Sequence, residues 1–362
     1  MEQKSSVGKS DASRMQAAVV SGVGQWVYQS VPKPAPVPGH VLVRTQQAGI
    51  CSTDVLRSFE TGFYHYPIVP GHEFCGVVDE VAKDVTNVRV GDRVAVYPLI
   101  ACGRCFACSK GKPNLCDSYD FLGSRCNGGY AEFVLAPSQN LILIPDEVSF
   151  SKAVMTEPSA VALHGHKVAG TSPEVESAVI FGLGPIGLMV AQWAKVLGVK
   201  QVIGVDRNSS KLAICRKIGV ETIIDSSKSD VVETIRSLTQ GIGAEIIFEC
   251  SGSEELQQNA VMSCRKLGQV VILGNPLGNL NLTSAQYSLI LRRELSIKGS
   301  WSSLIAPYNE WEETLDFMAK GLIDPSAMLT HQFPLSQAAQ VMRDMYTKEF
   351  KYSKVSFNFA DS

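Results

Sequence analysis

The chain has 362 residues, of which 45% are hydrophobic and 19% charged, and its formal net charge is -2. This length exceeds the usual size of one hydrophobic core, so the sequence predicts two domains. The nearly balanced charge argues against a nucleic-acid or acidic-lipid partner, and no apolar run reaches the roughly 18 residues of a membrane-spanning helix.

Residues 1–14 are polar and contain both acidic and basic side chains. They lack the apolar stretch of a secretory signal, and their acidic residues argue against a mitochondrial leader. We therefore expect a disordered tail over 1–14 and a cytoplasmic protein.

The next part of the chain, to about residue 156, reads as short apolar strands separated by glycine and proline, for example 41–44 and 94–96. It predicts a β-rich module. From about Pro158 the pattern becomes strand, helix, strand, with strands expected at 177–181, 201–206, 246–248 and 270–273 and helices at 185–197 and 210–218. This alternation predicts an α/β domain with a doubly wound parallel sheet.

After about Lys298 the alternation weakens, leaving an expected helix at 309–320 and a final strand at 354–357. We expect these elements to rejoin the first module. The predicted division is therefore 15–160 with 300–362 for the β-rich domain and 161–299 for the parallel sheet.

Four of the ten cysteines, Cys102, Cys105, Cys108 and Cys116, form the spacing C-x2-C-x2-C-x7-C. Four thiolates so close in sequence can enclose one zinc ion, and a closed shell of sulfur leaves no position for a substrate. The pattern therefore predicts a structural zinc site, with an iron–sulfur cluster as the alternative.

A second set of metal ligands is suggested by Cys51, His72 and Glu157. One sulfur, one imidazole and one carboxylate would leave the fourth zinc position open for water or an alcohol. Taken singly, each residue could equally be structural or solvated. Glu157 precedes Pro158, so its backbone is expected to be extended.

A dinucleotide-binding turn is predicted by Gly182, Gly184 and Gly187, which form G-x-G-x-x-G between the expected strand and helix, with Pro185 and Ile186 inside the motif. Asp206 ends the next expected strand, where a carboxylate binds ribose hydroxyls and repels a 2′-phosphate, which favours NAD. Arg207 leaves NADP open, and Lys211 is a further candidate for cofactor binding.

Together these residues resemble the zinc-containing medium-chain dehydrogenase/reductase family over nearly the whole chain beyond the tail. The resemblance implies a GroES-like catalytic domain and a Rossmann domain, two zinc ions and NAD. It places the catalytic zinc on Cys51, His72 and Glu157, with Glu73 as an alternate or neighbouring ligand, and implies a homodimer or homotetramer.

Glutamate at position 157 resembles the sorbitol dehydrogenase branch. Finer similarity to its galactitol-1-phosphate 5-dehydrogenases lies in residues 66–68, 119–125, 128–132, 282–285, 290–295 and 299–301. That subfamily has arginine at the position of Arg57, which with Arg125 is a candidate for binding a substrate phosphate. Arg57 could instead be solvated or pair with Glu60.

The expected reaction is oxidation of a secondary alcohol of a polyol or polyol phosphate to a ketose, with Thr53 accepting the alcohol proton. Many relatives use a histidine for proton exit at the position of Leu56, so water or a ribose hydroxyl must replace it. The alternatives are a zinc dehydrogenase for a diol, an amino alcohol or a simple secondary alcohol, and a non-catalytic cofactor-binding protein.

Overall fold

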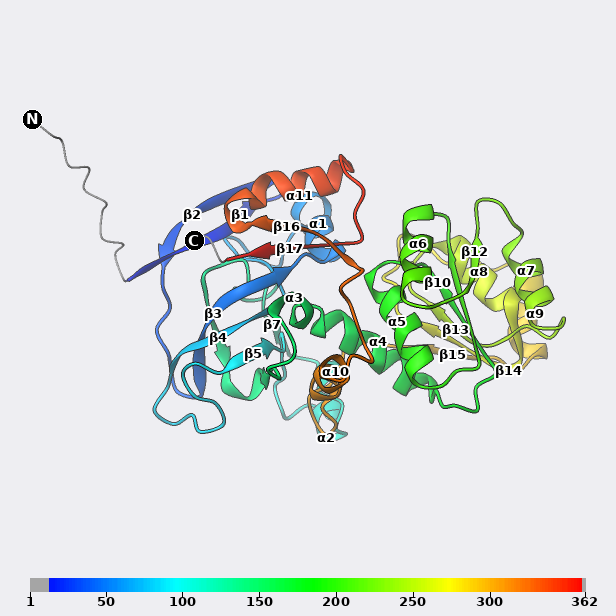
Figure 1. Ribbon diagram of the computed structural model, residues 1–362, viewed down its shortest axis with the longest axis horizontal. Coiled ribbons are helices and arrows are strands. Elements are labelled where there is room, and N and C mark those ends of the chain that lie inside the picture. The colour runs from blue at the N-terminus through cyan, green and yellow to red at the C-terminus, as the bar shows by residue number, and fades with distance from the viewer. Residues whose placement is uncertain (1–12, 360–362) are drawn as a thin grey trace, which may run out of the picture.

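The computed structural model describes residues 13–359, which form two halves lying side by side, each built around one large sheet (Figure 1). Most of the predicted N-terminal tail, residues 1–12, lies outside the described residues. Arg14, which was included in the predicted tail, is instead the first residue of strand β1.

The β-rich half contains a mixed seven-stranded sheet in which β8 pairs with β3 beside the main strand path. The C-terminal strand β17 pairs with β3 through Ser356 and Gly49, so the end of the chain does rejoin the first module. The path runs β16 (Leu329–Pro334), β17 (Lys354–Asn358), β3 (His40–Gly49), β4 (Glu73–Val81), β5 (Arg93–Val96) and β9 (Leu141–Leu143), with β8 at Phe133–Pro137.

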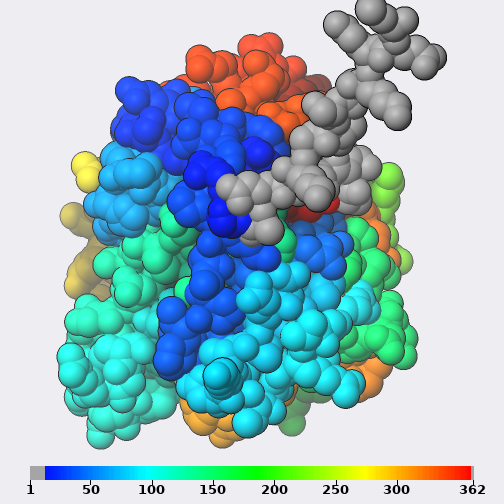
Figure 2. All heavy atoms as spheres, turned by 90° about the vertical axis from the view of Figure 1, so that its left-hand side faces the viewer, coloured from blue at the N-terminus to red at the C-terminus, as the bar shows by residue number. Residues whose placement is uncertain are grey.

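Two small antiparallel pairs complete this half: β1 (Arg14–Gly22) with β2 (Gln25–Pro32), and β6 (Leu99–Ile100) with β7 (Asp120–Phe121). Figure 2 shows the outer face of this half, where the blue N-terminal strands lie against the cyan segments that follow them. The β1–β2 pair is tied to the loop after β7 by backbone bonds, such as that from Ala18 to Tyr130.

The second half is a six-stranded parallel sheet of order β12-β11-β10-β13-β14-β15. Its strands are β10 (Ser177–Phe181), β11 (Gln201–Asp206), β12 (Thr222–Asp225), β13 (Ala244–Glu249), β14 (Cys264–Ile272) and β15 (Ser296–Gly299). Strand order reverses between β10 and β13, which opens a crevice for ligands at their carboxyl ends. The expected doubly wound α/β sheet is confirmed.

Helices connect and cover these strands, and α4 and α10 lie between the two halves (Figure 1). The α-helices are α1 (Ser52–Leu56), α2 (Phe106–Ser109), α3 (Phe150–Ala153), α4 (Thr156–Ala169), α5 (Pro185–Val196), α6 (Ser209–Lys217), α7 (Val231–Leu238), α8 (Glu254–Ser263), α9 (Ser284–Arg292), α10 (Glu310–Ala319) and α11 (Ala338–Thr347). Short helical turns are η1 (Arg57–Thr61), η2 (Pro113–Leu115), η3 (Ser138–Asn140) and η4 (Leu335–Gln337).

Two expectations about these elements are wrong. Glu157 is not extended, because Pro158 lies in the first turn of α4, where proline's missing N–H removes no helical hydrogen bond. The region after residue 320 also contains β16 and α11, which the sequence analysis missed.

Helix α4 spans 156–169 and thus crosses the predicted boundary at 160.

One hydrophobic cluster runs across the junction of the two halves, from Tyr97 after β5 to Trp193 of α5 and Trp311 of α10. All three side chains are at least 98% buried. The two halves are therefore joined by packed core as well as by chain crossings. Among the described helices, none is both long and apolar enough to cross a membrane.

Candidate active site with two metal centres

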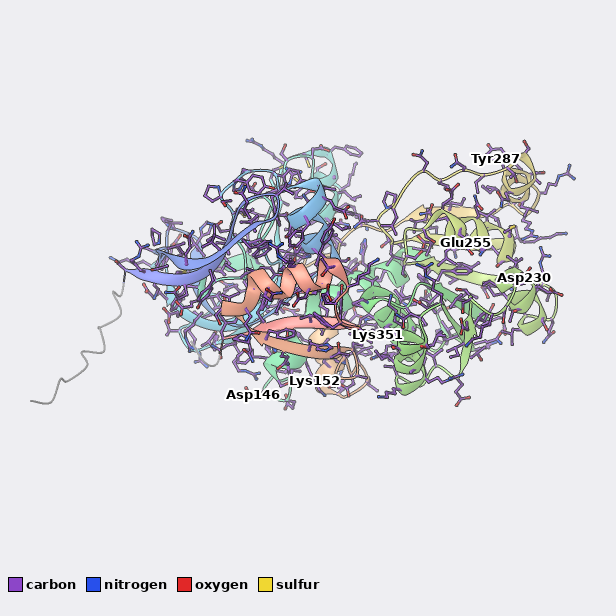
Figure 3. All side chains as sticks on the ribbon, turned by 90° about the horizontal axis from the view of Figure 1, so that it is seen from above. Asp146, Lys152, Asp230, Glu255, Tyr287 and Lys351 are labelled. Carbon is purple, nitrogen blue, oxygen red and sulfur yellow. The ribbon has the colours of Figure 1, made fainter. Side chains whose placement is uncertain are left out.

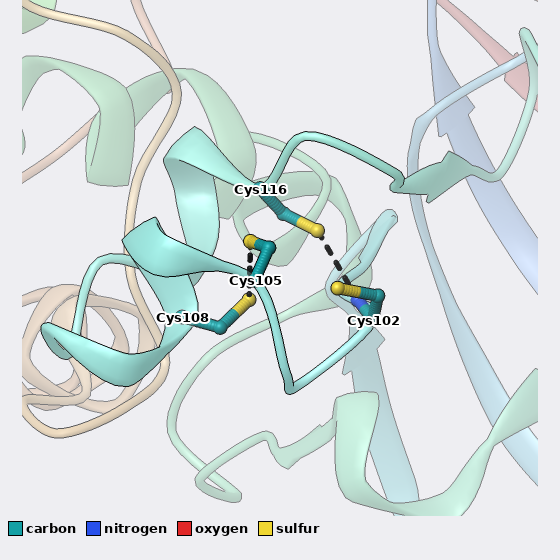
Figure 4. A group of neighbouring side chains, drawn as sticks. All are labelled: Cys102, Cys105, Cys108 and Cys116. Atoms are coloured by element: carbon teal, nitrogen blue, oxygen red, sulfur yellow. Dashed lines mark hydrogen bonds between the residues drawn. The ribbon is translucent and has the colours of Figure 1, made fainter.

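The four-cysteine motif folds into a small lobe in which the Sγ atoms of Cys102, Cys105, Cys108 and Cys116 all lie within 4.8 Å of one another. Cys105 precedes α2 and Cys116 follows η2, so two short helical turns bring the ligands together (Figure 4). Gly103 has a φ of +72°, a left-handed conformation that glycine adopts without steric cost.

Backbone N–H groups in this lobe point at the sulfur atoms. Cys102 N donates to Cys116 Sγ at 3.2 Å, and Ser118 N donates to the same sulfur at 3.4 Å. Hydrogen bonds from the backbone of Cys108 and Asp117 lower the pKa of Cys105 to about 6. Burial raises the pKa of Cys108 to about 12, so the lobe without a metal favours the thiolate at Cys105 and not at Cys108. Four cysteine sulfurs placed in this way fit a closed tetrahedral zinc site.

The second centre joins Cys51, His72 and Glu73, whose ligand atoms also lie within 4.8 Å of one another. Cys51 follows β3 and precedes α1, whereas His72 and Glu73 stand at the start of β4. Because β3 and β4 are antiparallel neighbours with Gly49 opposite Glu73, the end of one strand lies beside the start of the other. A thiolate, an imidazole and a carboxylate fit an open zinc site.

Asp54 orients His72 and was missed by the sequence analysis. Its Oδ1 lies 3.2 Å from His72 Nδ1, and its Oδ2 accepts a hydrogen bond of 2.9 Å from the Tyr130 hydroxyl. Asp54 is buried, with 1% exposure. A carboxylate on one imidazole nitrogen fixes the ring and leaves Nε2 for a metal. The signal was available, because Asp54 lies three residues after Cys51 at the start of a helix.

A buried ion pair joins Glu73 to Lys354 of β17, and both side chains are 2% exposed. Gly49 leaves room for this pair, since a Cβ there would lie 2.4 Å from Glu73 Oε2. Lys354 was also missed, although a lysine at the start of a buried strand signals a charged partner.

Glu157 lies in the first turn of α4 and is half-buried. Its carboxylate is not part of the tight group formed by Cys51, His72 and Glu73. Burial and the neighbouring Glu73 raise the pKa of Glu157 to about 7, while His72 and Lys354 act in the opposite direction. The structure therefore groups Glu73, and not Glu157, with Cys51 and His72, and Glu157 as a metal ligand stays a prediction.

Thr53, the expected proton acceptor, donates a hydrogen bond of 3.1 Å from its Oγ1 to Cys51 Sγ. It therefore lies directly at the open centre. Leu56 ends α1 and Arg57 begins the turn η1, so both are one helical turn further along the same segment.

The glycine-rich turn has the shape that a pyrophosphate requires. Gly182 has a φ of +85°, and a Cβ on Gly187 would lie 1.9 Å from the Gly182 carbonyl oxygen. At Gly184, in contrast, a Cβ would meet no heavy atom within 4 Å. Pro185 and Ile186 then begin α5, whose N-terminus faces this open space.

Asp206 ends β11 beside this turn. Its Oδ2 accepts a hydrogen bond from Leu183 N and its Oδ1 one from Asn208 N, both of 2.8 Å. Lys211 Nζ lies 3.8 Å from Asp206 Oδ2, and Arg207 is exposed. The carboxylate is therefore held in place by the backbone on both sides, with one cation next to it.

Arg57 and Arg125 meet at the ring of Tyr64. Their guanidinium carbons lie 4.8 Å and 4.2 Å from the Tyr64 centroid, and that of Arg125 lies 4.5 Å from the Tyr119 centroid. Within residues 13–359 neither arginine forms an ion pair, so the pairing of Arg57 with Glu60 is not seen. Hydrogen bonding from Arg57 lowers the pKa of Tyr64.

A chain of aromatic contacts connects this arginine cluster to the open centre. Phe121 packs edge-on against His72 at 5.7 Å between centroids, and Tyr119 packs against Phe121 at 6.3 Å. Because Tyr119 also lies under Arg125, a continuous row of ring contacts leads from the two arginines to His72.

Comparisons with known proteins agree with this geometry. The alcohol dehydrogenase GroES-like domain matches residues 37–146, and the zinc-binding dehydrogenase family matches residues 185–320. Galactitol 1-phosphate 5-dehydrogenase of Escherichia coli is 33% identical over 84% of this chain and 88% of that protein. Sorbitol dehydrogenase of Bacillus subtilis is 30% identical over 91% of this chain and 92% of that protein.

A solved structure is also similar: the short chain alcohol dehydrogenase RspB from Escherichia coli, in complex with NADH. It is 31% identical, with a TM-score of 0.87, and the match covers 96% of this chain and all of that one. With its GroES-like domain, its parallel Rossmann sheet, the four-cysteine site and the Cys/His/Glu centre, the chain belongs to the zinc-binding medium-chain alcohol dehydrogenases, in their sorbitol dehydrogenase-like branch.

Proposed function

We propose that this zinc alcohol dehydrogenase uses NAD to oxidise a secondary alcohol of a polyol or polyol phosphate to the ketose. Two features of one chain support the proposal. Cys51, His72 and Glu73 form an open metal centre, and the glycine-rich turn has free space at Gly184, where a cofactor phosphate could bind. The NADH-bound relative supports the choice of cofactor.

The chain's own residues supply most of the proposed chemistry. Bound zinc would act as a Lewis acid toward the substrate hydroxyl, and NAD would accept the hydride. Thr53 accepts the hydroxyl proton, because its Oγ1 already lies 3.1 Å from Cys51 Sγ. Asp54 holds the ring of His72, and Leu56 offers no route for the proton, so water or a ribose hydroxyl carries it onward.

The finer proposal is that the substrate carries a phosphate. Arg57 and Arg125 lie on the same tyrosine ring, and their charges have no acidic partner within the described residues. The Nε of Arg125 is buried and makes no hydrogen bond there. Two neighbouring guanidinium groups with spare donors suit the oxygens of a phosphate. The galactitol 1-phosphate relative supports the same substrate class.

The test compares galactitol and other polyols with their terminal phosphate esters, with NAD as cofactor. Losing a charge-assisted hydrogen bond costs about 1.5–3 kcal/mol, so Arg57→Ala should lower kcat/KM for the ester by about 10- to 150-fold. Turnover of the free polyol should change little. Arg89→Ala is a matched control, because Arg89 is exposed and pairs only with Asp92.

Equal efficiency of the wild type on ester and free polyol would contradict the phosphate proposal and leave the polyol proposal standing. If the protein preferred a diol, an amino alcohol or a simple secondary alcohol in the same panel, that substrate class would replace both the polyol and the polyol phosphate proposals. A protein that binds NADH but oxidises none of these compounds would be non-catalytic.

We also propose that the protein is a homodimer or homotetramer. The edge strand β15 has no further strand partner among the described residues, and α9 contains no buried residue. Tyr287 of α9 points outward at the far end of the molecule (Figure 3), and Leu291 is 63% exposed. An exposed apolar edge of this kind favours association. Light scattering on the purified protein would show its mass in solution.

A further inference from the structure

Two of the polar side chains of helix α4, Glu157 and His164, differ in their importance for the site. Glu157 lies in its first turn at the open centre, and His164 lies two turns further on, about 10 Å along the axis. His164 takes no part in the proposed chemistry, yet it is 5% exposed and lies where α4 meets α10. A buried histidine far from the reaction needs partners of its own.

Both ring nitrogens of His164 have such partners. Nδ1 lies 2.9 Å from Glu310 Oε1 of α10, and Nε2 lies 3.4 Å from Asn114 Nδ2 of η2. Because a carboxylate only accepts, Nδ1 carries the proton and Nε2 accepts from the Asn114 amide. Asn114 and Glu310 are also buried, at 2% and 1% exposure.

The outer ends of this network lie in two other segments. Asn114 lies in the zinc lobe between Cys108 and Cys116, and its Nδ2 also donates to the Trp301 carbonyl at 2.8 Å. Glu310 Oε2 accepts a hydrogen bond of 2.7 Å from Leu304 N. The four-cysteine lobe, α4, α10 and the 301–304 segment are thus tied together through one imidazole.

Other polar contacts of α4 attach it to the Rossmann half instead. Trp193 Nε1 of α5 donates to the Ser159 carbonyl at 3.1 Å, and His166 Nε2 lies 2.9 Å from the Val190 carbonyl, also of α5. Cys51 and His72 belong to the β-rich half. These contacts hold α4, which carries Glu157, to the Rossmann half, whereas His164 ties the same helix to the four-cysteine lobe of the half that contains Cys51 and His72.

We propose that His164 is a positioning residue: through Asn114 it fixes α4 against the four-cysteine lobe and so sets Glu157 relative to Cys51 and His72. The four-cysteine lobe thereby supports the open centre at a distance. This inference rests on Glu157 acting as a further ligand of that centre, as the family resemblance implies. Buried polar groups act together in such a network, since removing one leaves its partners unsatisfied.

The experiment follows zinc release from the full-length, zinc-loaded protein after addition of a chromophoric chelator. His164→Leu removes both contacts and should accelerate release from the open centre by about tenfold, the lower range for loss of a supporting contact. Release from the four-cysteine lobe should remain slow. KM for the alcohol should rise more than kcat falls, because the ligand is displaced rather than removed.

Two further variants distinguish the contact of His164 with Asn114 from its contact with Glu310. His164→Asn keeps a donor for Glu310 but cannot reach Asn114, and Asn114→Leu removes the same bond from the other side. Both should accelerate release, Asn114→Leu more strongly because it also removes the hydrogen bond to the Trp301 carbonyl, and they remain informative if His164→Leu fails to fold. Lys167→Met is the matched control, because Lys167 makes a surface pair with Glu313 of α10 at 2.6 Å.

Wild-type release rates in every folded His164 and Asn114 variant would overturn the inference while leaving the two-zinc site intact. Acceleration by Lys167→Met of equal size would overturn it too, because any α4–α10 contact would then suffice. A wild type with only one zinc would instead contradict the proposed open centre, and the inference would fall with it.

Discussion

The two metal centres differ in their ligands and are built in opposite ways. The closed centre takes all four sulfurs from residues 102–116, a single short lobe. The open centre groups Cys51 from the end of β3 with His72 and Glu73 from the start of β4, and Glu157 approaches it from a helix at the domain junction. The first depends on one loop, and the second depends on the whole fold.

This difference explains what each centre can do. A local loop can surround its ion completely, and four thiolates leave no room for chemistry. A centre assembled across strands and a junction keeps one side free, and its neighbours are buried polar groups such as Asp54 and Lys354. The variants below test whether the two centres are as independent in stability and in function as their construction suggests.

The largest effect is expected for Cys105→Ser, which removes one ligand of the closed centre. Binding of structural zinc contributes folding free energy, on the order of 10 kcal/mol in small zinc domains, so we expect loss of folded protein. Cys126→Ser is the control, since Cys126 lies near this lobe in sequence but outside its ligand group. Zinc content and circular dichroism measure the outcome, and a folded Cys105→Ser protein with wild-type activity would contradict it.

Chelation should separate the two centres in the wild type. A mild chelator is expected to remove one zinc and all activity while the fold remains, because the open centre has three protein ligands and the closed one has four. Metal analysis, activity and thermal unfolding should be followed on the same sample. If fully active protein contained one zinc or none, or if activity survived loss of the first zinc, the proposed division of roles would be wrong.

The same contrast determines what the sequence could predict. The four-cysteine motif and the turn at Gly182 to Gly187 are local, so their spacing alone indicated their structure. Asp54, Tyr130 and Lys354 come from separate segments, and only strand pairing shows that they meet at His72 and Glu73. The family resemblance implied a set of metal ligands but gave no indication of the residues that contact them.

Local rules also failed where tertiary packing decided the outcome. The residue before a proline prefers extended backbone, yet Glu157 is helical because Pro158 falls in a first turn. Strand β16 and helix α11 were missed, because the alternation of strands and helices that marks a parallel sheet ends before residue 320. Periodicity was enough to predict the fold class, whereas β16 is stabilised by its pairing with β17 in the β-rich sheet, which the sequence pattern does not show.

A smaller effect is expected from acid, through His166 on the helix that carries Glu157. Burial lowers the pKa of His166 to about 4 from 6.5, partly opposed by its contact with the Val190 carbonyl. Between these values the unfolded chain binds a proton that the folded chain does not. Stability should therefore fall as the pH drops from about 6.5 to 4, by about 3 kcal/mol in total.

Replacing His166 measures its contribution to the loss of stability in acid. Glutamine does not titrate, so the free energy of unfolding of His166→Gln should fall less steeply than that of the wild type over the same pH window. Urea unfolding at several pH values measures both slopes. Parallel slopes would mean that His166 is protonated in the folded protein, and that the junction helix does not add to acid sensitivity.

The smallest effect is expected at Asp206, where the nucleotide site repeats the contrast between local and assembled parts. The glycine turn is local, but Asp206 comes from the next strand and is held by the backbone of Leu183 and Asn208.

Asp206→Ala should raise KM for NAD by about tenfold, about 1.4 kcal/mol, through loss of a hydrogen bond to ribose. It should also relax discrimination against NADP, whose 2′-phosphate the carboxylate repels. Asp206→Asn keeps the shape but only one acceptor oxygen, so its NH2 group faces the backbone N–H of Leu183 or Asn208 and one of these two hydrogen bonds is lost. We expect it to relax discrimination by removing the charge, with a loss of stability of about 1 kcal/mol. Kinetics with both cofactors would decide the matter. Comparable wild-type efficiency with NAD and NADP would show that the exposed Arg207 dominates the pocket instead.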